Sequence, residues 1–239
     1  MRQPQRRMKL ALKDIVKEEL QKLLDAGFIY PISDNEWVSP LVLVPKKNGK
    51  WKICVDYWEL NKATKKENFP FPFIDQVLDG LAGKELFSFL DGFSGYNQIQ
   101  INPKDQDRTT FTYPWCTFAY RVLPFGLCNA PATFQRAVLS ILSELVHNSV
   151  EIYMDDFTPY GDDFQEALSN LGKVIRRCIE MHLSLSLEKC EFLKKVGVLL
   201  GHSISQAGIQ EDPNKITIIK RVLAPQKQKD VTSFFSFDG

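Results

Sequence analysis

The clearest pattern along the chain is a helical spacing of apolar residues near its start. Leucine, isoleucine and valine recur every three or four positions from residue 10 to residue 26, and Gly27 follows. This spacing predicts an amphipathic helix over residues 10–26 that ends at the glycine. Later helices are predicted up to about Gly83, from Pro131 to about Val146 with Asn129 as its N-cap, and over residues 163–181.

Apolar runs of strand length lie between these helices. Residues 41–45 and 51–56 are joined through Asn48-Gly49, a dipeptide that favours a tight hairpin turn. The apolar run from Leu86 to Asp91 predicts a buried strand that ends in a carboxylate. Further predicted elements are a second hairpin over Val150 to Tyr160 with its tip at Asp155-Asp156, short strands at 183–187 and 196–205, and a last helix starting at Asp212-Pro213. Because strands and helices interleave without a regular βαβ rhythm, the predicted fold class is α+β.

Composition narrows the class of protein. Hydrophobic residues make up 44% and charged residues 25% of the 239 positions, which is typical of a globular protein. We find no apolar run near the roughly 20 residues of a membrane span, so no membrane partner is expected. The five cysteines include no Cys-x-x-Cys pair and there are only three histidines, which argues against structural zinc. Reduced thiols in an intracellular compartment, cytoplasmic or nuclear, are the favoured interpretation.

The net charge of +1 conceals a segregation. Residues 1–66 hold 14 Lys/Arg against 8 Asp/Glu, a balance of +6, whereas residues 67–160 hold 5 against 11, a balance of −6. A basic segment beside an acidic one is typical of a polyanion-binding protein that also carries a carboxylate metal site.

Three aspartates stand where predicted strands end: Asp91, Asp155 and Asp156. At about 4 Å and an effective dielectric near 20, each pair of like charges costs roughly 4 kcal/mol, so such a cluster needs cations, shared protons or water. Hard oxygen ligands favour magnesium. The alternative is that the paired aspartates only form a polar turn, since aspartate is a favoured turn residue.

The surroundings of these aspartates resemble a known family. The segment Tyr153-Met154-Asp155-Asp156 resembles the YxDD box of reverse transcriptases. Four further blocks occur in that family's order, namely WKICVDYWELN (51–61), FLDGFSGYNQI (89–99), LPFGLCNAPATFQ (123–135) and VLLGHS (198–203). Together the blocks are similar to the polymerase of gypsy-type long-terminal-repeat retrotransposons, particularly those of plants. The resemblance covers residues 3 to 235.

The resemblance implies an RNA-directed DNA polymerase that uses two Mg²⁺ ions, with Mn²⁺ as a substitute. Asp91 and Asp155 match the principal metal-binding aspartates, and Asp156 matches a more peripheral one. Tyr96, after Gly95, matches the aromatic residue that excludes ribonucleotides, and this role is favoured over that of a core aromatic. Phe125 can equally be a packing residue. Further matches are the nucleotide-contacting positions Lys52, Phe125, Gly126 and Met154, a proton-donating lysine at Lys189, and a primer grip at Leu200, Gly201 and His202.

The resemblance also implies an architecture and partners. The expected arrangement is the right hand of polymerases, with fingers at 1–85, a palm with an interleaved fingers segment at 86–205, and the start of a truncated thumb at 206–239. The expected partners are an RNA and DNA template-primer and deoxynucleoside triphosphates.

Two departures from the family pattern leave alternatives open. Trp58 stands where the family usually carries arginine, and Cys116 replaces a turn glycine, which strains the backbone by about 1–3 kcal/mol if the position needs a positive φ. A truncated, non-catalytic relic that binds nucleic acid is therefore the main alternative. RNA-templated RNA synthesis is a further one, and Tyr96 argues against it.

Overall fold

The computed structural model describes the chain except residues 34, 46–50, 115, 213–215 and 218–239. The chain divides into two compact units. The first comprises Met1–Pro70 and Ser94–Val138, and the second comprises Phe71–Phe93 and Leu139–Gly239. None of the helices in the described part of the chain has the length and apolar character needed to cross a membrane.

The first unit is built on a five-stranded sheet with the strand order β1-β6-β5-β2-β3. Neighbouring strands are antiparallel except β2 and β5, which are parallel. The strands are β1 (Ile29–Pro31), β2 (Ser39–Pro45), β3 (Trp51–Val55), β5 (Phe111–Tyr113) and β6 (Cys116–Tyr120). The predicted pairing of the segments at 41–45 and 51–56 is confirmed, and the tip of this hairpin with Asn48-Gly49, Lys46, Lys47 and Lys50 lies outside the described residues.

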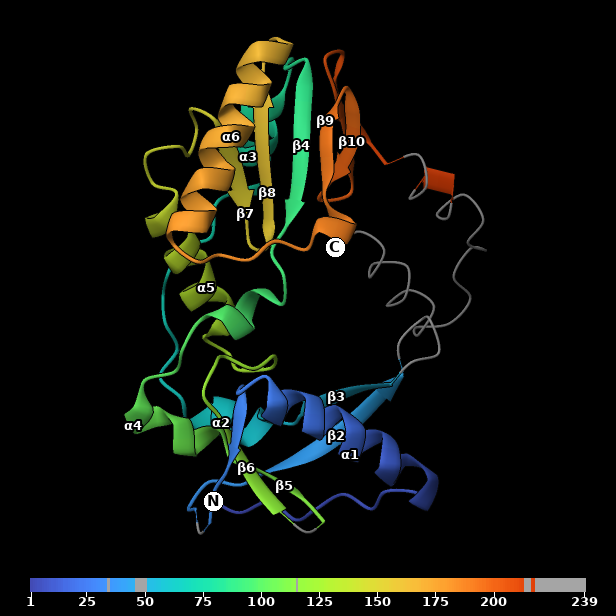
Figure 1. Cartoon of the computed structure of the whole chain (residues 1–239), viewed down its shortest axis with the longest axis vertical. Helices are drawn as coiled ribbons and strands as arrows, with labels where there is room; N and C mark the ends of the chain where they lie inside the picture. The colour runs from blue at the N-terminus through green and yellow to red at the C-terminus, as the bar shows by residue number, and fades with distance from the viewer. Residues whose placement is uncertain (34, 46–50, 115, 213–215, 218–239) are drawn as a thin grey trace, which may run out of the picture. The chain divides into compact units, whose positions relative to one another are not determined.

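The first helix, α1 (Leu10–Asp25), packs its apolar side against this sheet (Figure 1). Val16 and Leu20 are buried in the core cluster that also holds strand residues such as Leu41 and Phe118. The helix ends as its apolar spacing predicts, because Gly27 adopts a φ of 71° that a residue with a Cβ rarely takes. Shorter helical segments follow, namely α2 (Trp58–Ala63), η1 (Gly95–Gln98), α4 (Pro103–Gln106), η2 (Asp107–Thr109) and α5 (Ala130–Ile141).

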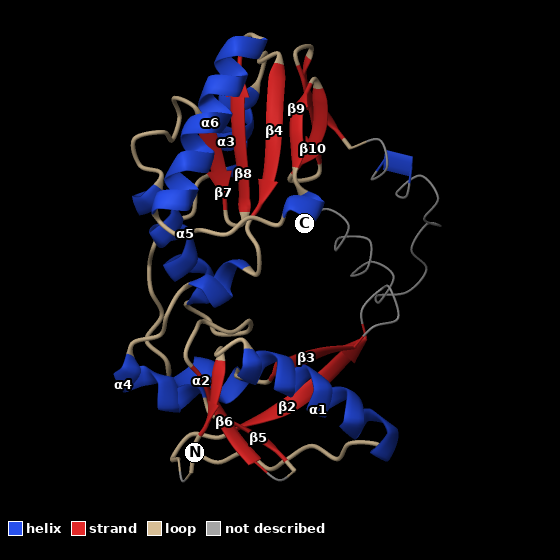
Figure 2. Cartoon of the chain, viewed as in Figure 1, coloured by secondary structure: helices blue, strands red, loops and turns tan. Residues whose placement is uncertain are grey.

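The second unit contains a four-stranded antiparallel sheet with the order β7-β8-β4-β9 (Figure 2). Its strands are β4 (Leu86–Asp91), β7 (Val150–Tyr153), β8 (Asp156–Gly161) and β9 (Glu191–Lys194). A smaller three-stranded sheet holds β10 (Val196–Leu199), β11 (His202–Ser205) and β12 (Gly208–Glu211). The helices of this unit are α3 (Ile74–Leu81), α6 (Phe164–Glu180) and the short η3 (Leu187–Lys189).

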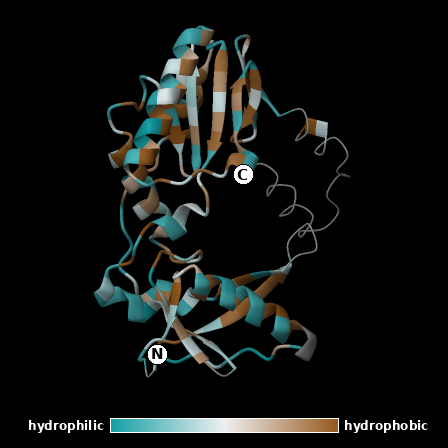
Figure 3. Ribbon diagram, in the orientation of Figure 1, coloured by the Kyte–Doolittle hydropathy of each residue, from teal (hydrophilic) through white to brown (hydrophobic). Residues whose placement is uncertain are grey.

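Both faces of the four-stranded sheet are covered. Phe87 and Tyr160 pack against α3 and against Leu199 and Ile204 of the smaller sheet. Helix α6 contacts β8 and β4 and begins as predicted, because the Asp163 side chain accepts a hydrogen bond from Glu166 N–H at 2.8 Å. Figure 3 shows the corresponding hydropathy pattern, with apolar strands in this sheet and both apolar and polar residues along α6.

Several predicted elements were wrong in their bounds. Helix α5 ends at Ile141 rather than near Val146, because the chain turns back there and the Leu142 and Leu145 carbonyls accept hydrogen bonds from the turn. The Asn129 side chain bonds to the backbone at residues 65 and 67 instead of capping α5. The strand predicted at 183–187 is only a single bridge at Leu185.

Several other elements have no local sequence pattern that predicts them. Strands β1, β5, β6, β9 and β12 were not predicted. The strands predicted over 196–205 are confirmed as the hairpin of β10 and β11. Cys116 lies in β6 without a positive φ, so the strain expected for it is absent. The last predicted helix, from Asp212-Pro213, falls largely outside the described residues.

Candidate functional site

The structure brings the three candidate aspartates together at one end of the four-stranded sheet. Asp91 is the last residue of β4, Asp156 is the first residue of β8, and these two residues are directly paired across the strands. Asp155 comes just before, and its carbonyl accepts a hydrogen bond from Gly92 N–H at 3.0 Å. Residues paired in this way have Cβ atoms about 4.5–5.5 Å apart, which puts two carboxylates side by side.

The local turn differs from the sequence prediction by one residue. Tyr153 pairs with Asp156, so the two-residue tip is Met154-Asp155 and not Asp155-Asp156. Met154 has a φ of 56°, which is uncommon for a residue other than glycine and costs about 1–3 kcal/mol. The backbone at the tip is therefore held in an unfavourable conformation that fixes where Asp155 lies.

The surroundings of Asp155 and Asp156 also disfavour the charged forms of their carboxylates. Burial raises the pKa of both Asp155 and Asp156, and the charge of Asp91 raises it further, while Lys189 lowers it. The Asp155 Oδ1 atom is buried and has no hydrogen-bond partner among the described residues. A buried carboxylate oxygen without a partner is costly unless a cation or a proton is supplied.

Lys189 brings a cation to this cluster. Its Nζ atom lies 3.0 Å from each carboxylate oxygen of Asp91. It comes from η3, whose start is tied to the end of β4 because Ser186 N–H donates to the Asp91 carbonyl at 2.8 Å. The sequence pattern placed Lys189 in the site by resemblance but gave no signal for this ion pair.

The donor set suits a hard divalent cation that arrives with its own ligands. Among the described residues, no group of three or more His, Cys, Asp and Glu side chains is arranged to hold a metal ion by itself. Magnesium, however, is usually held by one or two carboxylates together with waters and substrate phosphates. The Asp91–Asp156 pair and the buried Asp155 oxygen fit such a partial shell.

Five of the other candidates lie close together within the first unit. Lys52 Nζ lies 3.9 Å from the ring centroid of Phe125, a cation–π contact. The Phe125 ring meets Tyr96 edge-on at 5.0 Å between centroids, and Tyr96 meets the buried Phe134 at 5.6 Å. Gly126, next to Phe125, has a φ of 99°, which favours glycine. Gly95 is buried at the start of η1.

Phe134 was not singled out from the sequence. It has no exposed surface and packs against the edge of the Tyr96 ring. Its position one helical turn after Ala130, on the apolar side of α5, is the signal that identifies it as a core residue. The half-buried Tyr96 ring is thus held between Phe125 and Phe134.

The proposed primer-grip residues form the turn between β10 and β11. Leu199 pairs with His202, and the two intervening residues, Leu200 and Gly201, have φ values of 50° and 77°. Two positive φ values are typical of a type I′ hairpin turn. His202 Nδ1 lies 3.1 Å from the Leu200 carbonyl, which fixes the imidazole at the turn.

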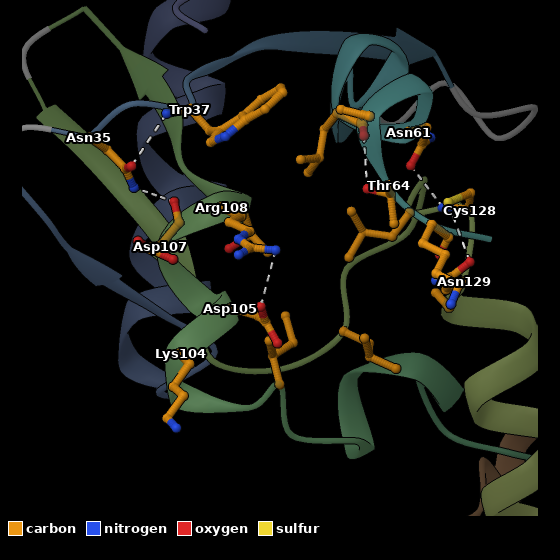
Figure 4. Close-up of a pocket in the computed structure, with 18 of the residues that line it drawn as sticks. Asn35, Trp37, Asn61, Thr64, Lys104, Asp105, Asp107, Arg108, Cys128 and Asn129 are labelled. Atoms are coloured by element: carbon orange, nitrogen blue, oxygen red, sulfur yellow. Dashed lines mark hydrogen bonds and ion pairs between the residues drawn. The ribbon is translucent and has the colours of Figure 1, made fainter. Parts of the chain in front are cut away.

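One pocket lies at the aspartates, and a larger one lies apart from the candidate residues. A pocket of about 360 Å³ lies beside Asp91 and Asp156 and is lined by Phe89, Thr158 and Lys189 among others. A larger pocket of about 750 Å³ lies in the first unit (Figure 4). There Arg108 pairs with Asp105, Asn35 bonds to Trp37 N–H, and Asn61 bonds to Cys128 N–H, so the polar groups that line it bind one another. It holds none of the sequence-predicted site residues.

The candidate residues are divided between the two units. The aspartates, Met154, Lys189 and the turn at Leu200–His202 belong to the second unit. Lys52, Gly95, Tyr96, Phe125 and Gly126 belong to the first.

Solved structures share this fold. A foamy viral protease-reverse transcriptase in complex with an RNA/DNA hybrid matches 99% of the chain with a TM-score of 0.88 and 24% identity, and the match covers 32% of that protein. The same type of enzyme in complex with double-stranded DNA matches with a TM-score of 0.90 and 25% identity, over 99% of this chain and 41% of that one. These matches confirm the α+β class and the right-hand polymerase fold.

Comparisons of sequence give the family. The family described as "Reverse transcriptase (RNA-dependent DNA polymerase)" matches residues 44–204. The Pol polyproteins of transposons 297 and gypsy from Drosophila melanogaster are 33% and 30% identical over 94% of the chain. The Tf2-3 polyprotein of Schizosaccharomyces pombe is 31% identical over 82%. The chain spans 15–22% of these three relatives. On these matches, the chain belongs to the reverse transcriptase family and is related to retrotransposon Pol polyproteins.

Proposed function

We propose that this chain is an RNA-directed DNA polymerase domain that adds deoxynucleotides to a primer 3′-hydroxyl by two-metal phosphoryl transfer. The observation that carries the proposal is the cross-strand pair of Asp91 and Asp156 with the unpartnered Asp155 oxygen beside it. Family membership supports the reaction class. The finer assignment to a gypsy-type element of plant origin rests on the sequence blocks alone.

Asp91 and Asp155 would hold the principal divalent cations, with Asp156 more peripheral. Two Mg²⁺ ions, or Mn²⁺ in their place, would activate the primer hydroxyl and stabilise the departing pyrophosphate. The chain's own contribution is to fix the carboxylates at the end of β4 and at the strained Met154-Asp155 tip, so that the ligands need no rearrangement when charge develops. Because positioning and electrostatics dominate phosphoryl transfer, the reaction requires no histidine.

The aromatic cluster of the first unit would select and orient the nucleotide. Tyr96 would crowd the 2′ position of the sugar, with Gly95, Phe125 and Gly126 forming the surrounding wall. The Lys52 ammonium, which rests on the Phe125 ring, would move to the triphosphate, since phosphate oxygens attract it more strongly than a ring face. Met154 and Lys189 are proposed as further nucleotide-contacting residues, as the family resemblance implies.

The nucleic-acid partner is proposed to be an RNA or DNA template with a DNA primer. The solved relatives hold an RNA/DNA hybrid and double-stranded DNA, which supports this choice. The rigid turn at Leu200, Gly201 and His202 would contact the primer backbone, because a glycine allows close approach.

We propose that the first unit works mainly as fingers and the second mainly as palm. The boundaries expected from the sequence put residues 71–85 in the fingers, whereas they belong to the second unit. Residues 94–138 of the first unit fall within the range 86–205 that was expected for the palm with its interleaved fingers segment. The alternative of a non-catalytic relic now rests on Trp58, which is 67% exposed at the start of α2, because Cys116 is unstrained.

Primer extension on an RNA template with Mg²⁺ and deoxynucleotides tests the proposal. The wild-type chain should extend the primer, and Asp155→Asn should lower the rate by at least about a hundredfold, a loss typical of removing a catalytic electrostatic group. Asp162→Asn, a change at an exposed aspartate of the same unit, is the control and should be fully active. Equal activity of the wild type and Asp155→Asn would refute the assignment, and inactivity of all three would favour the relic.

A further inference from the structure

Lys189 contacts both carboxylate oxygens of Asp91. Its Nζ atom is equidistant from both oxygens of Asp91, at 3.0 Å from each. The Asp91 side chain is 26% exposed, and the Lys189 side chain is 66% exposed. The ammonium therefore faces the same pair of oxygens that a cation held by Asp91 would use.

The backbone that carries Lys189 is fixed to the end of β4. Phe93 N–H donates to the Ser184 carbonyl at 3.0 Å, and Ser186 N–H donates to the Asp91 carbonyl at 2.8 Å. Gly92 and Leu185 form a bridge between these two bonds, and Lys189 N–H donates to the Ser186 carbonyl at 2.9 Å. The segment 184–189 is thus built against Asp91, which keeps its lysine within reach of the carboxylate.

The neighbouring aspartates explain why a cation beside Asp91 is stabilising. Asp91 is paired with Asp156, and Asp155, in the turn, immediately precedes Asp156. Like charges directly opposite one another on neighbouring strands destabilise a sheet. A fixed ammonium on Asp91 offsets that repulsion and holds the carboxylate in one orientation.

We propose that Lys189 is a built-in counter-ion for Asp91, which stabilises the carboxylate cluster and competes with the divalent cation for the same two oxygens. The inference rests on the proposed metal site and adds a positioning residue to it. Two cations on one carboxylate repel each other, so the ammonium has to leave Asp91, at least in part, when a divalent cation binds. The cation's affinity is lowered accordingly.

Three measurements that need no catalysis test the proposal at one pH and ionic strength. Mg²⁺ binding is measured by calorimetry and Mn²⁺ binding by electron paramagnetic resonance, and the melting temperature is measured in EDTA. Lys189→Met, which keeps the aliphatic stem, should bind both cations about two- to fivefold more tightly, as expected for losing an exposed competing charge. In EDTA it should melt about 1–3 °C lower.

Lys194→Met is the matched control. Lys194 lies on β9 in the same unit and pairs with Glu191 at 3.8 Å, away from the aspartates. Its loss should change the cation affinity by less than the Lys189 change does. Lys189→Gln serves as a second variant in case Lys189→Met misfolds, and the double variant Asp91→Asn/Lys189→Met should show no gain in affinity over Asp91→Asn.

An unchanged or weaker cation affinity in Lys189→Met and Lys189→Gln overturns the counter-ion proposal. That result leaves the polymerase proposal standing, because primer extension decides it separately. Conversely, a gain in affinity that depends on Asp91 supports the counter-ion even if no primer is extended.

Discussion

At the scale of single residues, the surroundings of the carboxylate cluster disfavour the charged forms of Asp155 and Asp156. Burial and the neighbouring Asp91 raise the pKa of Asp155 and Asp156, so their charged forms are disfavoured in the folded chain. A raised pKa of an acid contributes stability below the ordinary value of about 3.9, and that contribution is lost as pH rises through the raised value. Electrostatic destabilisation of this kind is expected at functional sites, where stability is given up for activity.

Asp155→Asn should therefore stabilise the protein in EDTA at pH 7. The change removes a half-buried charge next to Asp91, and the expected gain is up to about 1 kcal/mol in the free energy of unfolding. Urea unfolding at pH 4 and pH 7 measures it, and the gain should be smaller at pH 4, where more of the carboxylate is protonated. The exposed Asp162→Asn should show no such gain. Destabilisation by Asp155→Asn at pH 7 would contradict this electrostatic picture.

A second prediction concerns the role of the Tyr96 ring in nucleotide selection. Phe125 and Phe134 contact it edge-on, so its position is restrained. Tyr96→Val should admit ribonucleotides and lower the discrimination against them by about 10- to 100-fold in single-nucleotide extension, the range for a change in pocket shape. Tyr30→Val, in strand β1, is the control and should keep the wild-type discrimination. Unchanged selectivity in Tyr96→Val would leave Tyr96 as a core aromatic.

At the scale of elements, α3 packs closely against one buried carboxylate of β7. Glu151 on β7 is 2% exposed, and both of its oxygens lie within 3.2 Å of His147 Nδ1. A Cβ at Gly80 of α3 would lie only 2.6 Å from Glu151 Oε1. The helix approaches the strand this closely because residue 80 is a glycine.

Gly80→Ala should for this reason destabilise the protein by about 1–3 kcal/mol, although alanine is the better helix former. Gly172→Ala in α6 is the matched control, because a Cβ there meets nothing closer than the Arg176 side chain at 3.7 Å. That change should stabilise by up to about 1 kcal/mol. Thermal and urea unfolding of both variants measure the difference, and a stabilising Gly80→Ala would show that Glu151 yields easily.

Local signals decided which elements were predictable. Helices α1 and α6 follow from apolar periodicity, Gly27 and the Asp163 cap, all of which act within a few residues. Strand β9 pairs with β4, which lies about a hundred residues earlier. The four residues of β9 contain no pattern that predicts this pairing. The Lys189–Asp91 ion pair depends on the same kind of distant packing.

At the scale of the whole molecule, charge is divided along the chain. Residues 1–66 carry a balance of +6 and residues 67–160 a balance of −6. The acidic part contains all three candidate aspartates, and the basic part contains Lys52. The family and the candidate aspartates were recognisable from ordered sequence blocks, whereas the two-residue tip with Asp156 already in β8 required the fold.

The proposed two-metal site is tested most directly by anomalous diffraction with Mn²⁺ on crystals of the protein with a primer-template and an incoming deoxynucleotide. Anomalous peaks bound by the carboxylates of Asp91 and Asp155 are expected, about 3.5–4 Å apart if both ions are present. Manganese found elsewhere, with none of Asp91, Asp155 and Asp156 as a ligand, would contradict it.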